Sequence, residues 1–149
     1  MAIKKSAYSR ATNRLQSPSP YVVNQPVEII VSHTFTEALP TTDILELVAL
    51  PPNCKILAAH LMTEGTGATT ITAGFMSGDF GSTDPARTSG NELFSAVTPT
   101  TEQSTSLVSL AGLATSDSPR SIGVRGSANI AANAATKLHM RLRYITGQS

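Results

Sequence analysis

Few residues in this sequence have the types and the spacing that catalysis or metal binding requires. Asp79-Phe80-Gly81 matches a metal-binding tripeptide of protein kinases, but a chain of 149 residues without a catalytic-loop motif is too short for a kinase. Gly65-Thr66-Gly67 lacks the lysine and the spacing of a phosphate-binding loop, so we interpret it as a hairpin turn. Asp79 and Asp84 could offer oxygen ligands to calcium, yet the loop does not follow the EF-hand pattern and a turn-forming role is favoured. The sequence therefore predicts no cofactor.

The histidines and the single cysteine also lack partners at a recognisable spacing. His33, His60 and His139 fall in three separate predicted strands, and none has a second histidine at metal-ligand spacing. Cys54 is the only cysteine, so it cannot close an internal disulfide or supply a thiolate cluster. Charged residues make up 14% of the chain, against roughly 25% in ordinary soluble domains. Because ionisable groups are this sparse and no nucleophile signature is present, we predict a protein that is not an enzyme.

The N-terminal part of the chain differs from the rest. No acidic residue precedes Glu28, and the opening stretch carries four cations, Lys4, Lys5, Arg10 and Arg14. Proline favours extended backbone at Ser17-Pro18-Ser19-Pro20 and at Pro26. We therefore expect two parts, an extended basic N-terminal arm over residues 1–26 and a β domain over residues 27–149. An arm with so little apolar surface gains order only against another protein or a nucleic acid.

The sequence contains no stretch typical of a membrane span or a secretory signal. It has no run of about twenty apolar residues, and Met1-Ala2-Ile3-Lys4-Lys5 is followed by polar residues instead of an apolar stretch. We expect a protein that is soluble and intracellular at synthesis and has no membrane partner.

Alternating and doubly apolar segments predict the β domain. From Val27 to Phe35 apolar residues recur at every second position, with Ile30 as the one exception. The segment from Ile44 to Leu50 is apolar on both faces apart from Glu46, and it ends at a Pro-Pro-Asn turn signal. The segment from Lys55 to Met62 is again apolar on both sides. Two such runs favour the central strands of a sandwich or barrel.

Weaker patterns complete the predicted fold. Further strands are expected over residues 70–76, over residues 93–97 and around residues 122–124, with a loop over residues 77–91. Leucines recur at every third position over residues 105–113, which indicates a short helix weakened by Gly112. In the last strand four side chains face one way, namely Leu138, Met140, Leu142 and Tyr144. The fold class predicted is all-β, a single antiparallel β-sandwich or jelly-roll-like domain with an extended N-terminal arm.

Basic residues occupy the opposite side of the last strand, which carries Lys137, His139, Arg141 and Arg143. Such a stripe could meet phosphate or an acidic protein surface, but an ordinary solvent-facing strand is slightly favoured. The four cations of the arm are fewer than the about six to ten phosphate contacts of a strongly salt-dependent binder. Tyr8 and Tyr21 are the only aromatic rings in the arm, so base stacking is poorly supported. Nucleic acid is therefore not expected as a partner.

Two parts of the sequence resemble small virion proteins of tailed bacteriophages. The run from Leu47 to Ala59, LVALPPNCKILAA, followed by Thr70-Ile71-Thr72-Ala73-Gly74, resembles a strand-turn-strand-hairpin of these proteins. The closing run from Lys137 to Tyr144, KLHMRLRY, is similar to their last strand. The resemblance covers residues 44–144 and transfers no catalytic residue. It implies a small jelly roll or related β-sandwich that decorates the capsid or joins head and tail, as a trimer or ring, with a terminal arm laid over neighbouring subunits.

The leading hypothesis is thus a non-enzymatic virion structural protein, a capsid decoration or cement protein assembled in the host cytoplasm. Ordering the arm costs about 1–2 kcal/mol per residue in backbone entropy, so an ordered arm must make many contacts. Its expected partners are capsid proteins and copies of itself, arranged as a trimer or another cyclic homo-oligomer. The predicted partner-binding residues are Lys4, Lys5, Arg10, Arg14, Arg141 and Arg143.

Two alternatives remain open at this stage. The chain could form the viral shell itself, with its arm facing the genome, although such an arm normally holds more than four cations. It could instead be a tail-associated module that binds a host surface or carbohydrate. That function would favour exposed aromatic side chains, whereas the chain has no Trp and only 5% aromatic residues.

Overall fold

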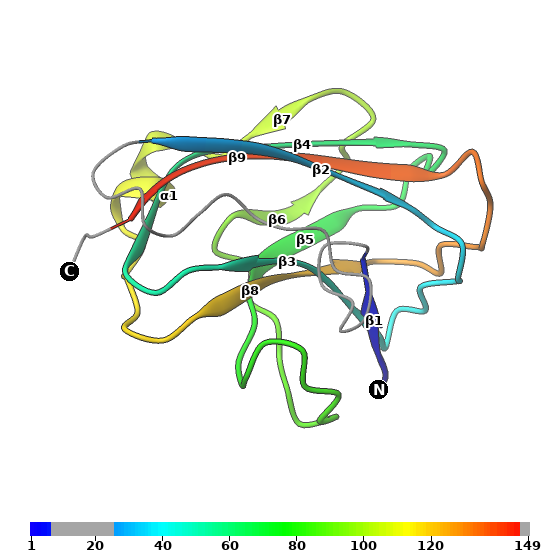
Figure 1. Ribbon diagram of the computed structural model, residues 1–149. Coiled ribbons are helices and arrows are strands. Elements are labelled where there is room, and N and C mark those ends of the chain that lie inside the picture. Colours follow the sequence, from blue (N-terminus) through cyan, green and yellow to red (C-terminus); the bar gives the residue numbers. More distant parts are fainter. Residues whose placement is uncertain (7–25, 147–149) are drawn as a thin grey trace.

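Two β-sheets face each other in the computed structural model, which describes residues 1–6 and 26–146 (Figure 1). The first sheet contains, in spatial order, β1 (Ile3–Lys5), β3 (Ile44–Leu50), β8 (Arg120–Gly126), β5 (Ile71–Phe75) and β6 (Phe94–Val97). The second contains β2 (Val27–Thr34), β9 (Lys137–Thr146), β4 (Cys54–Glu64) and β7 (Gln103–Ser104). One short helix, α1 (Leu107–Ala111), links β7 to β8. The predicted all-β sandwich is therefore confirmed.

The strand pairing follows the jelly-roll scheme. β2 pairs with β9, β3 with β8, β4 with β7 and β5 with β6, all of them antiparallel. The chain thus behaves as a long hairpin of four strand pairs that is rolled into two four-stranded sheets. β1 is an addition to this scheme, because it pairs with β3 in parallel and forms a fifth strand at the sheet edge.

The core lies between the two sheets and contains the side chains that alternation predicted. In β9 the four inward residues are fully buried, with Leu138, Met140 and Leu142 at 0% exposure and Tyr144 at 1%. They meet inward residues of both sheets in one apolar cluster, to which Val31, Phe35, Leu61, Ile71 and Ile122 belong. Burying such side chains is the main favourable contribution to folding.

The outer faces of the two sheets differ. β3 is buried along almost its whole length, because the segment from Met76 to Glu92, which we call the covering segment, folds back over the outer face of the first sheet. A paired couple of glycines, Gly74 on β5 and Gly123 on β8, makes this close approach possible. A Cβ atom at Gly123 would lie 2.5 Å from Met76 Cγ, and one at Gly74 would lie 2.5 Å from the Gly90 carbonyl carbon.

The second sheet keeps its outer face open. β4 is central in this sheet, but its outward side chains Leu57 and Met62 are each 40% exposed. The doubly apolar pattern of β4 therefore does not mean burial on both faces. A register shift between Ile56 and Ala58 interrupts the pairing with β9 at Leu57, and it accounts for part of the irregular pattern.

The N-terminal strand and the shortest elements differ from the sequence-based predictions. Residues Ile3–Lys5 form β1 within the chain's own sheet, whereas residues 7–25, most of the predicted arm, lie outside the described residues. The division into an arm and a domain therefore stays a prediction. β7 has only two residues and was not predicted. The predicted helix is present but shorter, because Ser106 caps it by accepting a hydrogen bond from Ser109 N (3.2 Å) and it ends before Gly112.

Candidate interaction surfaces

The N-terminal strand is held against β3 by polar contacts as well as by strand pairing. Ala2 N donates to Asp43 Oδ1 (2.8 Å), and Lys4 Nζ lies 3.9 Å from Asp43 Oδ2. Ser6, at the end of the strand, is fully buried, and its hydroxyl donates to the Leu47 carbonyl. These contacts fix the first six residues to the sheet without any apolar core of their own.

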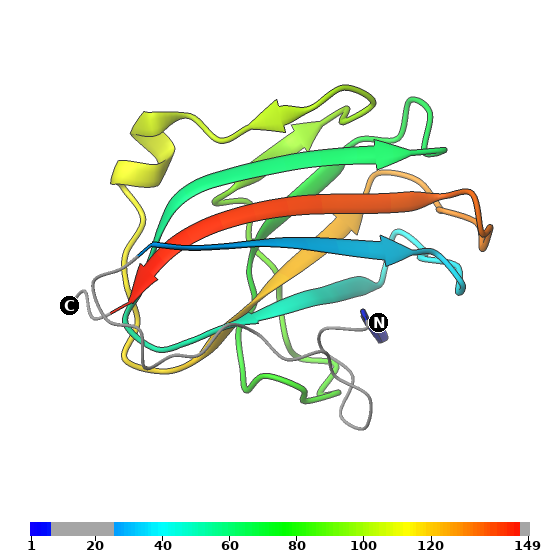
Figure 2. The ribbon, with the colours of Figure 1, turned by 45° about the horizontal axis from the view of Figure 1, so that its top comes forward.

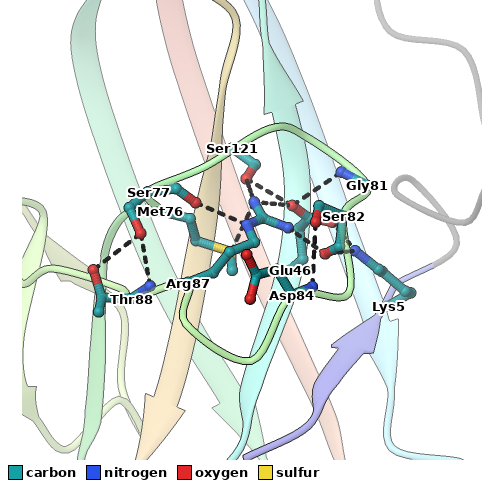
Figure 3. A network of polar contacts seen from close by, with 10 residues as sticks. All are labelled: Lys5, Glu46, Met76, Ser77, Gly81, Ser82, Asp84, Arg87, Thr88 and Ser121. Atoms are coloured by element: carbon teal, nitrogen blue, oxygen red, sulfur yellow. Dashed lines mark hydrogen bonds and ion pairs between the residues drawn. The ribbon is translucent and has the colours of Figure 1, made fainter.

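A buried carboxylate connects this strand to the rest of the first sheet (Figure 3). Glu46 is 0% exposed and lies on the outer side of β3 beneath the covering segment. Its Oε2 accepts hydrogen bonds from Arg87 Nη2 (2.6 Å) and Ser121 Oγ (2.8 Å), and its Oε1 forms an ion pair with Lys5 Nζ. β1, β3, β8 and the covering segment therefore meet at a single side chain, and we call Lys5, Glu46, Arg87 and Ser121 the buried cluster.

Arg87 also fixes the loop in which it lies. Its Nε donates to the Ser77 carbonyl (2.7 Å) and its Nη1 to the Ser82 carbonyl (2.7 Å), while the side chain is only 2% exposed. The same loop contains Gly78 and Gly81 at positive φ angles of 76° and 84°, which glycine adopts readily. A guanidinium with several fixed donors suits this role, because it can satisfy carbonyls and a carboxylate at once.

The charge on Glu46 is maintained inside the protein. Burial by itself would raise the pKa of Glu46, but hydrogen bonds from Lys5, Arg87 and Ser121 act in the opposite direction and prevail. The pKa of Glu46 therefore lies below its ordinary value, and the carboxylate is ionised at neutral pH. A buried charge with this many partners is a fixed structural element rather than a proton donor or acceptor.

The basic residues of β9 lie on the open face of the second sheet, and two of the four, His139 and Arg141, have acidic partners. Arg141 Nε lies 3.5 Å from Glu28 Oε1, and Arg141 Nη2 lies 3.3 Å from Glu102 Oε1. His139 Nε2 lies 2.7 Å from Glu64 Oε2, and this hydrogen bond is the main cause that lowers the pKa of Glu64. Strands β2 and β4 therefore supply acidic side chains on both sides of β9, so the predicted positive stripe is partly neutralised at His139 and Arg141.

A shallow hollow occupies the middle of this open face. It is lined mainly by apolar surface and by side chains from β2, β4, β9 and the residue before β7, namely Ile30, His60, Met62, Glu102, His139 and Arg141. Ile30, the one exception to the alternation of β2, is 61% exposed here. His60 Nδ1 lies 3.5 Å from Glu102 Oε1, so the acidic and basic groups of the hollow stand in pairs.

The predicted partner-binding residues fall into three groups. Lys4 and Lys5 lie in β1, where both have acidic neighbours within the chain. Arg10 and Arg14 lie outside the described residues. Arg141 and Arg143 lie on the outer side of β9, in the other sheet, and Arg143 is exposed. The structure therefore does not bring these cations together, and a contact with a partner stays a prediction for each of them.

Asp84, His33 and Cys54, which were candidate metal ligands or nucleophiles in the sequence, are engaged in turn formation or packing. Asp84 Oδ1 accepts a hydrogen bond from Ala86 N (2.9 Å), as expected of a turn residue. His33 packs edge-on against Phe35 with ring centroids 4.9 Å apart. Burial raises the pKa of the Cys54 thiol to about 11, although the nearby Arg120 charge acts in the opposite direction. A thiol with this pKa is a poor nucleophile at neutral pH.

Neither a metal centre nor a membrane helix is found in the described part of the chain. Residues 1–6 and 26–146 contain no group of three or more His, Cys, Asp or Glu side chains that could hold a metal ion. In the same residues, no helix has the length and apolarity needed to cross a membrane.

Sequence reasoning missed the buried cluster, although one signal for it was present. Glu46 is the single charged residue in an otherwise apolar strand, and a buried carboxylate requires donors. Its partners Arg87 and Ser121 follow it by 41 and 75 residues, and neither belongs to a motif. The position of the partners follows only from the three-dimensional fold.

The fold is similar to chains of known phage capsids. No protein-family model matches the sequence, and no curated protein matches it. A chain of the capsid of Ralstonia phage GP4 superposes with a TM-score of 0.85 and 29% sequence identity, over 99% of this chain and 100% of that chain. A chain of the acidic stable capsid of Helicobacter pylori bacteriophage KHP30 has a TM-score of 0.50 and 17% identity, over 83% of this chain and 89% of that chain. The second likeness concerns the fold alone, whereas the first extends over both chains from end to end.

Proposed function

We propose that this protein is a non-enzymatic structural component of a phage virion, and that it decorates the capsid as a cement protein. The observation that carries the structural role is the likeness to a chain of the Ralstonia phage GP4 capsid, at 29% identity over 99% of this chain. A match of this extent covers the whole jelly roll and β1 together. It supports a protein that assembles with capsid subunits and with copies of itself.

The charge distribution supports decoration over a genome-facing shell. A genome-binding surface needs cations that are available to phosphate. In the described residues Lys5 pairs with Glu46, while Arg141 pairs with Glu28 and Glu102. The whole chain has a formal net charge of only +1. A chain with so little net charge suits contacts to other proteins, so the shell-forming alternative with a genome-facing arm is less well supported.

The decoration role also agrees with the difference between the covered first sheet and the open second sheet. The first sheet is closed on its outer side by the chain's own covering segment and carries the fixed N-terminal strand. The second sheet presents an open face with exposed Ile30 and Met62. A small β domain with one open face and an N-terminal segment can lie on a lattice and contact several subunits.

The test is to ask where the chain sits and whether it forms shells by itself. Purified full-length protein is added to capsids that lack it, and binding is measured by co-sedimentation, followed by imaging of the particles. A cement protein saturates at a fixed ratio and gives density outside a continuous shell made by another protein. The proposal fails if this chain forms the continuous shell, or if it does not bind capsids at micromolar concentration.

Binding of nucleic acid distinguishes the alternative. The full chain is titrated with double-stranded DNA at increasing salt, and the slope of the binding constant against salt is recorded. For a cement protein we expect weak binding or none at physiological salt. Tight, strongly salt-dependent binding would favour the genome-facing shell protein instead.

A further inference from the structure

The hollow on the second sheet is an unusual feature for the outer face of a β-sheet. Outward positions of an open face normally carry polar side chains. Here Ile30 and Met62 are 61% and 40% exposed and stand on either side of β9, in register with Arg141 and His139 respectively. The carboxylate of Glu102 is 3.3 Å from Arg141 Nη2 and 3.5 Å from His60 Nδ1, so the rim offers balanced charge.

A convex apolar feature lies elsewhere on the same molecule. Leu107 and Val108, adjacent residues at the start of α1, are 80% and 84% exposed, and we call them the knob. Leu110 on the same helix is 7% exposed and anchors it to the core, while Ser106 caps it. The knob is therefore presented by a helix that is fixed to the domain. Figure 2 shows α1 beside the end of β7, at one end of the sandwich.

The knob has no charged side chain of its own, and the charged side chains of the hollow stand in pairs. The stretch from residue 103 to residue 116 around the knob contains no Asp, Glu, Lys or Arg. An uncharged knob requires a receptor without uncompensated charge, because burying an unpaired charge is unfavourable. The hollow meets this requirement, since its Arg and His side chains are matched by Glu28, Glu64 and Glu102. A phosphate-bearing or strongly basic ligand would find no such match.

We propose that the hollow of one copy receives the Leu107–Val108 knob of a second copy of this chain. A molecule does not fill its own hollow, because its knob is exposed in the single chain. Knob and hollow are different surfaces, so each copy can give its knob and receive another: reciprocally in a two-fold dimer, or head to tail in a ring that closes when the rotation between copies permits. The inference deepens the proposed function, on which it rests for self-assembly, by naming the surfaces through which the copies meet.

Mixed single-cysteine variants test the contact directly. One full-length preparation carries Val108→Cys and the other carries Met62→Cys, both in a Cys54→Ala background. The two are mixed, oxidised mildly and separated on a non-reducing gel. We expect a disulfide-linked heterodimer from this mixture, and little from either preparation alone. Ala132→Cys, at an exposed loop position, is the matched control for random collision when mixed with Val108→Cys.

Sedimentation of charged variants gives an independent measurement. Val108→Asp and Met62→Asp each place a carboxylate at the centre of the contact, whereas Thr100→Asp places one at an exposed turn. We expect the first two to weaken self-association about tenfold or more, as for a central interface residue, and the third to leave it unchanged.

The outcomes separate this inference from the proposed function. No heterodimer above the Ala132→Cys control overturns the inference, whether or not the wild type is oligomeric. Oligomers that persist in both Asp variants overturn it as well, since the copies must then meet elsewhere. Capsid binding of the wild type is scored separately. If cross-linking fails while capsids are still bound, only the inference falls; if capsids are not bound, the proposed function falls.

Discussion

Replacing Arg87 by methionine should destabilise the protein strongly, because it removes the more deeply buried of the two cations that pair with a buried carboxylate. Arg87 Nη2 lies 2.6 Å from Glu46 Oε2, and the two side chains are 2% and 0% exposed. Breaking a buried ion pair by removing one partner costs about 3–5 kcal/mol. Glu46 keeps Lys5, Ser121 and Gly81 N as donors, which places the expected loss near the lower end, at about 3–4 kcal/mol. The carbonyls of Ser77 and Ser82 lose a charged donor as well.

The assay is urea unfolding of the full chain followed by far-ultraviolet circular dichroism, because the chain has no Trp. Arg125→Met is the matched control, since Arg125 is exposed on β8, and its free energy of unfolding should change by no more than about 0.5 kcal/mol. The double variant Glu46→Leu/Arg87→Met should be more stable than Arg87→Met alone, because it leaves no uncompensated carboxylate. A loss below about 1 kcal/mol for Arg87→Met would refute the reasoning, since that is the range of an exposed pair.

Three further predictions concern Glu46, Cys54 and Gly123. The pKa of Glu46 is lowered in the folded state, so the stabilisation by its charge is present above its ordinary pKa of 4.5 and is lost as the pH falls through the lower folded value. Glu46→Gln should therefore reduce the loss of unfolding free energy at acidic pH. An unchanged loss of stability at acidic pH would contradict this. Cys54, with a pKa of about 11, should react with a disulfide reagent at pH 8 far more slowly in the native than in the urea-unfolded chain; equal rates would show that the thiol is accessible. Gly123→Ala should lower the free energy of unfolding by about 1–3 kcal/mol, since its Cβ would lie 2.5 Å from Met76 Cγ. The control Gly67→Ala has no atom within 4 Å of its Cβ, so in the same unfolding assay it should show only the smaller strain of its positive φ.

The strands that face the core could be predicted from the sequence because burial imposes a period on their residues. Ile44–Leu50 has the bounds that the apolar run indicated, and the inward residues of β9 are those that alternation selected. β1 and β7 could not be predicted in this way, since three and two residues are too few to display a period. Their position depends on edges that β3 and β4 provide after folding.

The surfaces were harder to predict than the core for a different reason. Charge counts along the sequence suggested a basic arm and a basic strand, but the fold brings Glu46 to Lys5 and Glu28 to Arg141. Net charge at a site depends on which strands become neighbours, and that information is not local. The exposed side chain of Ile30 did carry a local signal, because it broke the alternation of β2. An apolar residue at an outward position of an alternating strand, such as Ile30, therefore points to an exposed apolar surface.

The two outer faces of the sandwich together restrict where partners can bind. Over β3 and β8 the outer side is covered by the chain's own segment, and that cover is fastened by Arg87 through a carboxylate that also holds Lys5. A partner there would have to displace a buried ion pair, which is costly. The second sheet has no such cover over Met62 and the hollow, and the charged side chains that line the hollow are already paired. Contacts to other subunits should therefore fall on the open face and on the end of the sandwich at α1, and less on the cations that the sequence made conspicuous.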